Sequence, residues 1–207
     1  MPPTTPIRVG VAGWDYDDWK GIVYPARKER GFDPVRYLAA YLDLIEINST
    51  FYRPARPEVA AKWAARVEDL ENFRFTAKLW RRFTHEREQA WTLGEVRRVR
   101  DGLDPLHEAG KLDAVLVQFP WSFKNEEENR AWLADLVSAF RKYPLVVEVR
   151  HESWNDPEFY AWLAERGVGF VNIDQPLFRR SIKPSAKSTA RVGYVRGHGR
   201  NYRDWWR

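Results

Sequence analysis

Short runs of apolar residues alternate with amphipathic stretches along the whole chain. The run at residues 7–13 is rich in β-branched residues and ends on glycine, which predicts a strand. Within residues 126–143, apolar side chains recur every three or four positions, which predicts a helix that buries one face. The same reasoning predicts strands at 7–13, 43–48, 73–78, 113–119, 145–154, 168–174 and 191–196, and helices at 34–42, 57–67, 86–109, 126–143 and 157–166.

Alternating strands and helices at this spacing indicate parallel strands joined by crossovers, in either an open sheet or a closed barrel. Polar residues at the carboxyl end of every strand favour the barrel, because there all strands open on one central mouth. Within 145–154, for example, Glu148 and Arg150 share one face and His151 follows. We therefore predict an α/β fold, a TIM-type (β/α)8 barrel. Seven strands are visible in the sequence, and we expect that a C-terminal eighth strand and helix are missing. We expect residues 1–207 to form a single domain.

Composition narrows the functional classes. The 207 residues are 44% hydrophobic and include no cysteine, which rules out disulfides, cysteine nucleophiles and thiolate metal sites. No apolar run has the length of a membrane helix, and the first residues lack an apolar secretion signal, so we expect a cytoplasmic protein with no membrane partner. The net charge of +5 favours an anionic small molecule or nucleic acid as partner. The sequence does not identify a cofactor or an oligomeric state.

Several motifs resemble one known family. They read VAGWDYDDWKGIVYP from position 11, EINSTFYRP from 46, LVQFPWSF from 116, EVRHESW from 148 and YVRGHGR from 194, and FTAK and FTH lie between them. In order and spacing these segments resemble the YecE-like family, a domain of unknown function (number 72), over nearly the whole chain. The resemblance implies a TIM barrel and no particular reaction. Family members usually continue through a further helix and strand after the point where this sequence stops.

The candidate site residues are the polar side chains expected at the barrel mouth. Acids, a lysine and two histidines can transfer protons or form covalent intermediates, and arginines, amides and aromatic rings can hold an anionic ligand. The catalytic candidates are Glu46, Lys78, Glu148, His151, Asp174 and His198, and the substrate-binding candidates are Asn48, Arg53, Gln118, Arg150, Arg196, Trp14 and Tyr52.

Other interpretations of these residues stay open. The charges can form a structural ion-pair network with no chemistry. A metal held by Glu46, Glu148, Asp174 and His198 is a rival mechanism, although the neighbouring cations would repel it, and no metal ligand is predicted. Lys78 can act as a Schiff-base nucleophile or stay ion-paired. Rings after the strands, including Trp80, Trp121, Trp154, Trp205 and Trp206, can stack on a ligand or only pack between loops.

Three functions follow. The first is an enzyme, a hydrolase, lyase or isomerase, acting on a phosphorylated or nucleotide-like substrate. The second is a protein that binds or processes nucleic acid, with or without a metal. The third is a non-catalytic binding barrel. The second function would use the arginines that follow the third strand, which are Arg81, Arg82, Arg87, Arg97, Arg98 and Arg100.

Overall fold

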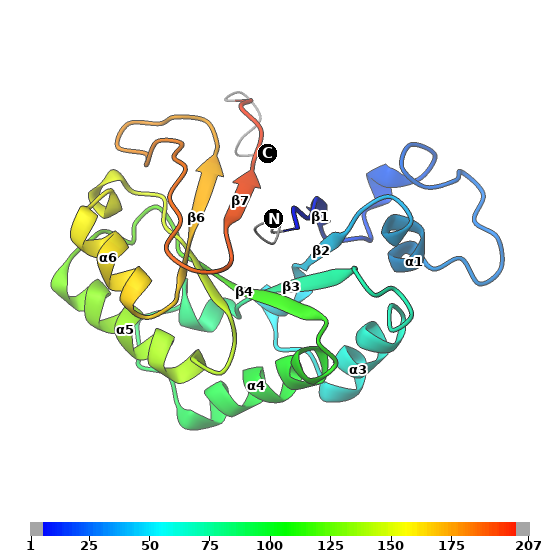
Figure 1. Cartoon of the computed structure of the whole chain (residues 1–207), viewed down its shortest axis with the longest axis horizontal. Coiled ribbons are helices and arrows are strands. Elements are labelled where there is room, and N and C mark those ends of the chain that lie inside the picture. Colours follow the sequence, from blue (N-terminus) through cyan, green and yellow to red (C-terminus); the bar gives the residue numbers. More distant parts are fainter. Residues whose placement is uncertain (1–5, 202–207) are drawn as a thin grey trace, which may run out of the picture. The chain divides into compact units, whose positions relative to one another are not determined.

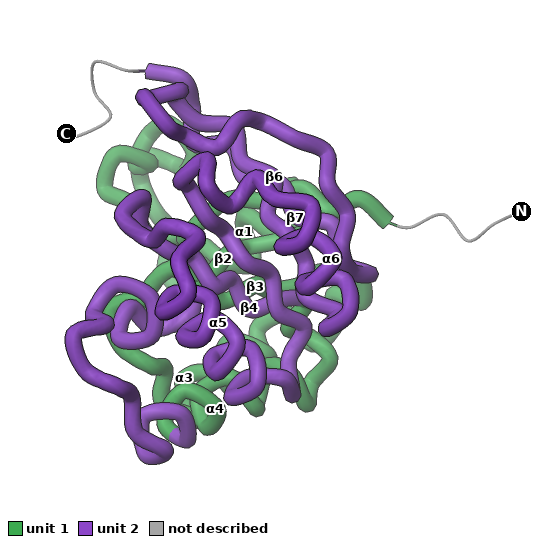
Figure 2. Tube along the Cα trace, turned by 90° about the vertical axis from the view of Figure 1, so that its left-hand side faces the viewer, with its two compact units in different colours: residues 1–78, 98–113 green, residues 79–97, 114–207 purple. Residues whose placement is uncertain are grey.

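The structure is a computed structural model that describes residues 6–201. The described chain forms two compact units, shown in two colours in Figure 2. The first comprises the residues up to 78 together with 98–113, and the second comprises 79–97 together with the residues from 114 onward. Two elements run from one unit into the other: helix α4 (Leu93–Glu108) and strand β4 (Leu112–Gln118).

The first unit holds three parallel strands in the order β1-β2-β3. Gly10 pairs with Leu44, and Glu46 pairs with Thr76. A Cβ atom on Gly10 would lie 2.0 Å from the carbonyl oxygen of Leu44, so only glycine allows this close approach. Its elements are β1 (Gly10–Ala12), η1 (Asp17–Trp19), α1 (Pro34–Ala39), β2 (Leu44–Ile47), α2 (Ser49–Tyr52), α3 (Pro57–Ala65) and β3 (Arg74–Lys78).

The second unit continues the pattern with the parallel order β4-β5-β6-β7. Helices α5 and α6 lie along one side of these strands (Figure 1). Besides β4 its elements are η2 (Arg81–Phe83), α5 (Glu127–Phe140), β5 (Leu145–Glu148), η3 (Glu152–Trp154), α6 (Pro157–Glu165), β6 (Gly169–Asp174) and β7 (Tyr194–Gly197). The strand and helix order confirms the α/β, TIM-type (β/α)8 class with seven strands in the described chain.

The second unit is built around strands that are apolar on both faces, as parallel strands covered by helices require. Val117 and Val147 on one face, and Leu116 and Val146 on the other, have no exposed surface. Trp154 belongs to this core: its ring stacks on Phe123, and its Nε1 donates a hydrogen bond of 2.7 Å to the Phe123 carbonyl. Of the two interpretations left open for Trp154, the structure therefore supports packing within the protein. Trp205 and Trp206 lie outside the described residues.

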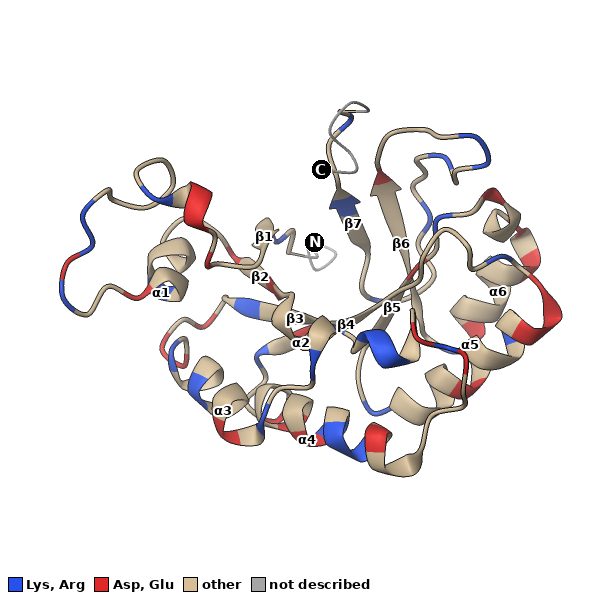
Figure 3. Ribbon diagram, turned by 180° about the vertical axis from the view of Figure 1, so that it is seen from behind, with Lys and Arg blue, Asp and Glu red and all other residues tan. Residues whose placement is uncertain are grey.

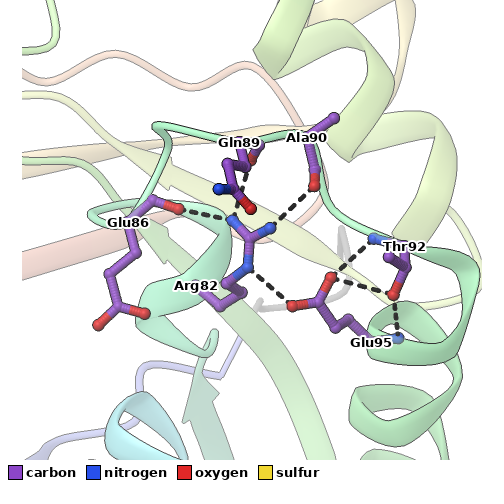
Figure 4. Close-up of polar contacts among 6 residues, drawn as sticks. All are labelled: Arg82, Glu86, Gln89, Ala90, Thr92 and Glu95. Carbon is purple, nitrogen blue, oxygen red and sulfur yellow. Dashed lines mark hydrogen bonds and ion pairs between the residues drawn. The ribbon is translucent and has the colours of Figure 1, made fainter.

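Helix α4 begins at Leu93, seven residues later than the sequence pattern predicts. Arg82 is the physical reason, because its guanidinium donates to the carbonyls of Glu86, Gln89 and Ala90 and to the Glu95 carboxylate (Figure 4). These bonds hold residues 86–90 in a loop in place of a helical turn. Thr92 and Glu95 then start the helix as a capping box, in which each side chain accepts from the other residue's backbone N–H.

The connection from β6 to β7, residues 175–193, contains neither a helix nor a strand, as the sequence predicts. We call it the strap. Asn172 fixes it, since its Oδ1 accepts from the Lys187 N–H and the Ser185 hydroxyl and its Nδ2 donates to the Lys187 carbonyl. Nearer the middle of the strap, the Ile182 N–H donates to the Arg150 carbonyl at 2.8 Å. The strap therefore reaches the residues that follow β5 through main-chain bonds.

Candidate functional site

Glu148, the last residue of β5, carries a carboxylate with no exposed surface. Its Oε1 accepts two hydrogen bonds from Arg150, from Nε at 3.1 Å and from Nη2 at 3.0 Å. Its Oε2 accepts from Arg196 Nη1 at 2.7 Å. A buried carboxylate is costly unless it is paired, and here two guanidinium groups pair it.

His198 completes what we call the Glu148 cluster: Glu148, Arg150, Arg196 and His198, all in the second unit. Its Nε2 lies 3.5 Å from Glu148 Oε1 and 3.3 Å from Arg196 Nη1. A protonated ring can donate to the carboxylate, whereas a neutral ring with its proton on Nδ1 can accept from the guanidinium. The same nitrogen cannot do both at once. His198 is thus placed where either protonation state has a partner.

The carboxylate of Glu148 stays ionised. Burial by itself raises the pKa of Glu148, but the hydrogen bond from His198 and the positive charges of Arg196 and Arg150 outweigh burial and lower that pKa to about 2. Glu148 is therefore a fixed negative charge at neutral pH. This excludes it as a general acid in this arrangement, and it acts instead as the anchor of two arginines.

The cluster carries more positive than negative charge. Two guanidinium groups face one carboxylate, and the side chains of Arg150 and Arg196 are 19% and 13% exposed. The Arg150 side chain uses Nε and Nη2 on Glu148 and makes no other hydrogen bond or ion pair within residues 6–201. Its Nη1 edge can still bind an oxygen, and a guanidinium fork suits carboxylate or phosphate.

Gln118 ends β4 directly beside Glu148, its partner in the parallel register. Partners in a parallel register point to the same face, and neighbouring strands lie about 4.8 Å apart. Gln118 is 7% exposed, and its Oε1 is buried without a hydrogen-bond partner in the described chain. The sequence correctly predicts that Gln118 shares the face of Glu148.

Asp174 does not join the cluster. Because Val147 pairs with Phe170, register places Val171 and Ile173 on the face of Glu148, and Asn172 and Asp174 on the opposite face. Asp174 instead forms a bidentate ion pair with Arg200, whose Nε donates to Oδ1 and whose Nη2 donates to Oδ2, both at 3.0 Å. Acidic and basic segments do end β6 and β7 at the same edge (Figure 3), but the alternation of β6 is opposite to the one predicted.

His151 lies just after β5 and is 4% exposed. The Ser153 N–H donates to its Nδ1 at 3.1 Å, so Nδ1 accepts and the proton of the neutral ring lies on Nε2. Nε2 is buried and has no hydrogen-bond partner in the described chain. The same holds for the hydroxyl of Ser181, whose backbone forms an isolated β-bridge with that of His151. Burial lowers the pKa of His151, and the charge of Lys124 lowers it further. The imidazole is thus held neutral, and it bonds to Ser153 rather than to a member of the Glu148 cluster.

The remaining candidates belong to the first unit. Register confirms that Glu46 shares a face with Thr76, and Glu46 is 5% exposed. Lys78 ends β3, and its Nζ lies 4.0 Å from the centre of the Phe51 ring, a cation–π contact. Asn48 precedes α2, and its Nδ2 lies 3.5 Å from the Tyr16 hydroxyl. Roles for these residues stay predictions.

Three binding candidates of the first unit lie closer to its surface. Trp14 packs edge-on against Trp63 of α3, with ring centres 5.7 Å apart, as a structural ring would. Tyr52 is 68% exposed, and Arg53 follows it at the end of α2 and is exposed as well. Exposure of this kind leaves both side chains open to a ligand but positions neither.

The arginines considered for nucleic acid are largely engaged within the protein. Arg81 pairs with Glu86 at 2.7 Å, and Arg82 binds the loop described above. Arg87 donates to Asn129 Oδ1 at 2.7 Å and stacks 4.6 Å above the Phe123 ring, and burial lowers its pKa. Arg97 and Arg98 remain exposed on α4.

The structure also bears on two features considered from the sequence, a metal site and a membrane-spanning helix. Within residues 6–201, no group of three or more His, Asp or Glu side chains is arranged to hold a metal ion. The described helices include none that is long and apolar enough to cross a membrane. Ser181 and Asn172 are the polar residues whose structural roles the sequence does not reveal, because the strap has no periodicity from which a pairing can be inferred.

Comparison with known proteins then supplies the family. The model of a protein family described as "Protein of unknown function DUF72" matches residues 8–207. The chain belongs to the DUF72 family. It is 27% identical to the UPF0759 protein YunF of Bacillus subtilis, over 96% of this chain and 72% of that protein. It is 24% identical to the UPF0759 protein YecE of Escherichia coli, over 96% of this chain and 65% of that one.

Solved DUF72 structures share the fold. A family member from Thermotoga maritima superposes with a TM-score of 0.80 at 30% identity, over 97% of this chain and 77% of that one. A member from Enterococcus faecalis has a TM-score of 0.80 at 26% identity, over 96% of this chain and 72% of that one. The resemblance seen in the sequence motifs is confirmed.

Proposed function

We propose that this DUF72 protein is an enzyme that binds an anionic, phosphorylated or nucleotide-like substrate at the Glu148 cluster. One observation carries the proposal: a fully buried carboxylate holds two arginines in place, and the outer edge of Arg150 remains without a partner in the described chain. The Nη1 edge of Arg150 is therefore left to bind an anion, and a guanidinium fork suits phosphate or carboxylate.

The location of the cluster supports this proposal. Glu148 is the carboxyl end of β5, and Arg196 lies near the carboxyl end of β7. In TIM-type barrels, active sites lie at this end of the strands. Glu148 positions both arginines before a ligand arrives, so the ligand does not have to order them.

His198 is the group that we propose for proton transfer. Its Nε2 reaches both a carboxylate oxygen and a guanidinium nitrogen, and an imidazole nitrogen can either donate or accept a proton. Glu148 would then provide electrostatic support, and Arg150 and Arg196 would hold the anion. The reaction class, whether hydrolase, lyase or isomerase, is part of the hypothesis that an activity screen resolves.

An anionic small molecule is favoured over nucleic acid as partner. Arg81, Arg82 and Arg87 would have to leave their intramolecular partners to bind a phosphate backbone. A small anion needs only the cluster. We also propose a cytoplasmic location, where phosphorylated metabolites are abundant, which cell fractionation can test.

Calorimetry with inorganic phosphate and a series of phosphate esters tests the proposal. We expect Arg150→Met to weaken binding at least about tenfold, because one charge-assisted contact is worth about 1.5–3 kcal/mol. Arg97→Met, on the exposed side of α4, is the matched control and should bind like the wild type. Equal affinities for all three proteins, or no binding by folded wild type, would overturn the proposal.

A further inference from the structure

The side chain of Gln118 indicates a hydrogen-bonding group of the ligand other than the anionic group that the arginines would bind. Its Oε1 is buried and has no hydrogen-bond partner within residues 6–201, and its side chain is more than nine-tenths buried. A buried polar group without a partner is destabilising, so each one in a native structure needs an explanation. Packing alone would be served better by an apolar residue.

The surroundings show from where a partner can come. Register places Leu116 and Val146 below Gln118 and Glu148 on the same face, and both are apolar and fully buried. The two Glu148 oxygens beside Gln118 are themselves acceptors, held by Arg150 and Arg196, and cannot donate to Oε1. Neither β5 nor the layer below therefore supplies a partner, and we infer that a ligand approaches from the carboxyl end of β4, the end at which barrels bind their ligands.

We propose that Gln118 recognises a hydroxyl group of the ligand whose anionic group binds Arg150 and Arg196. The inference rests on the proposed function and deepens it: the ligand is a hydroxylated anion, such as a sugar phosphate or polyol phosphate, rather than a bare anion. A hydroxyl both donates and accepts hydrogen bonds. It therefore satisfies the amide in either orientation, with Oε1 accepting or with Nε2 donating.

Two phosphate esters of the same length test this assignment. Glycerol 3-phosphate carries two hydroxyls, and propyl phosphate carries none. For the wild type, calorimetry should show about tenfold tighter binding of glycerol 3-phosphate, because a site built to bond a hydroxyl rejects the analogue that lacks it. In Gln118→Leu this preference should disappear, while the affinity for propyl phosphate stays unchanged. Gln89→Leu, at an exposed position of the same unit, is the control and should keep the preference.

The melting temperature without ligand gives a second, independent result. If Gln118 is kept for a ligand, replacing its unpartnered amide by leucine should raise the melting temperature, by about 3 °C for each kcal/mol gained. If its role is structural, the same change should lower it. Gain of stability together with loss of hydroxyl recognition is the expected pair of results.

The outcomes separate this inference from the proposed function. If neither ester nor phosphate binds the wild type, the proposed function fails, and the inference fails with it. If both esters bind through Arg150 but with equal affinity, or if Gln118→Leu keeps the preference, the anion site stands and the assignment of Gln118 is overturned. A lower melting temperature of the ligand-free Gln118→Leu variant would also contradict it.

Discussion

Arg196 Nη1 donates to Glu148 Oε2 at 2.7 Å, and so joins two strands separated by 48 residues in the sequence. Arg150 holds the other oxygen of the same carboxylate. Removing the negative charge by Glu148→Gln would leave two guanidinium groups facing each other in a buried site. We expect the free energy of unfolding, measured by urea denaturation, to fall by about 3 kcal/mol. Glu165→Gln, which breaks an exposed ion pair with Arg166, should cost less than about 0.5 kcal/mol.

Acid denaturation should identify the same carboxylate. The pKa of Glu148 is lowered from 4.5 to about 2 in the folded protein, so the unfolded chain binds the proton more tightly. The stabilisation by Glu148 is therefore complete above pH 4.5 and is lost as the pH falls from 4.5 towards 2. In that window the wild type should lose more stability than Glu148→Gln. Parallel stability curves of the two proteins would show that Glu148 is not paired as described.

Arg82 should hold the loop before α4. Its guanidinium serves three carbonyls and the Glu95 carboxylate, and only a planar group with several donors can do this. We expect Arg82→Lys to lower the free energy of unfolding by about 2 kcal/mol and to speed hydrogen exchange at residues 86–92. Arg97→Lys, at an exposed position, should do neither. An unchanged exchange rate in Arg82→Lys would contradict this role.

Asn172 should control the order of the strap. It makes three hydrogen bonds to Ser185 and Lys187, so Asn172→Leu removes all of them at once. We expect faster hydrogen exchange, by at least about tenfold, at residues 183–190, with little change in β4. Asn155→Leu, at an exposed position where one bond to Tyr160 is lost, serves as the comparison. Equal protection of the strap in both variants would rule out the anchoring role.

His151 should stay neutral with its proton on Nε2. Burial and then the charge of Lys124 lower its pKa, so the unfolded state takes up a proton first as the pH falls. The contribution of His151 to stability is present above the ordinary value of 6.5 and declines as the pH falls below it. Nitrogen NMR of the ring should show the Nε2–H form at pH 7. A ring protonated on Nδ1 at that pH would contradict the bond from Ser153.

Much of the fold is legible in the sequence because parallel strands leave a strong pattern. Polar residues at strand ends give the correct face for Glu46, Lys78, Gln118 and Glu148, since a single apolar and polar alternation fixes each of those strands. Asp33 before Pro34 is a local helix-start signal of the same kind, and its Oδ1 accepts from the Val35 N–H. Local signals of this kind need no tertiary information.

Other features depend on contacts that the sequence does not show. In β6 the polar residues face away from Glu148, because Asn172 has to satisfy the backbone of the strap, which covers that strand without a helix. The start of α4 depends on Arg82, ten residues before the capping Thr92. In both places a tertiary hydrogen bond overrides the local pattern. The Thr92–Glu95 capping box was the one local signal that could have given the correct helix start.

The strap connects the proposed anion site to a segment of the chain that lies outside the Glu148 cluster. Ile182 N–H donates to the Arg150 carbonyl and Glu152 N–H donates to the Arg180 carbonyl, both at 2.8 Å, so main-chain bonds enclose His151 on either side. A shift of the backbone that carries Arg150 must stretch or carry along residues 180–182. On the proposed function, we expect an anion bound at Arg150 to change the amide NMR signal of Ile182, although Ile182 is not one of the residues that bind the anion. A substitution in the strap can, by the same linkage, tune affinity while every residue of the Glu148 cluster stays as it is.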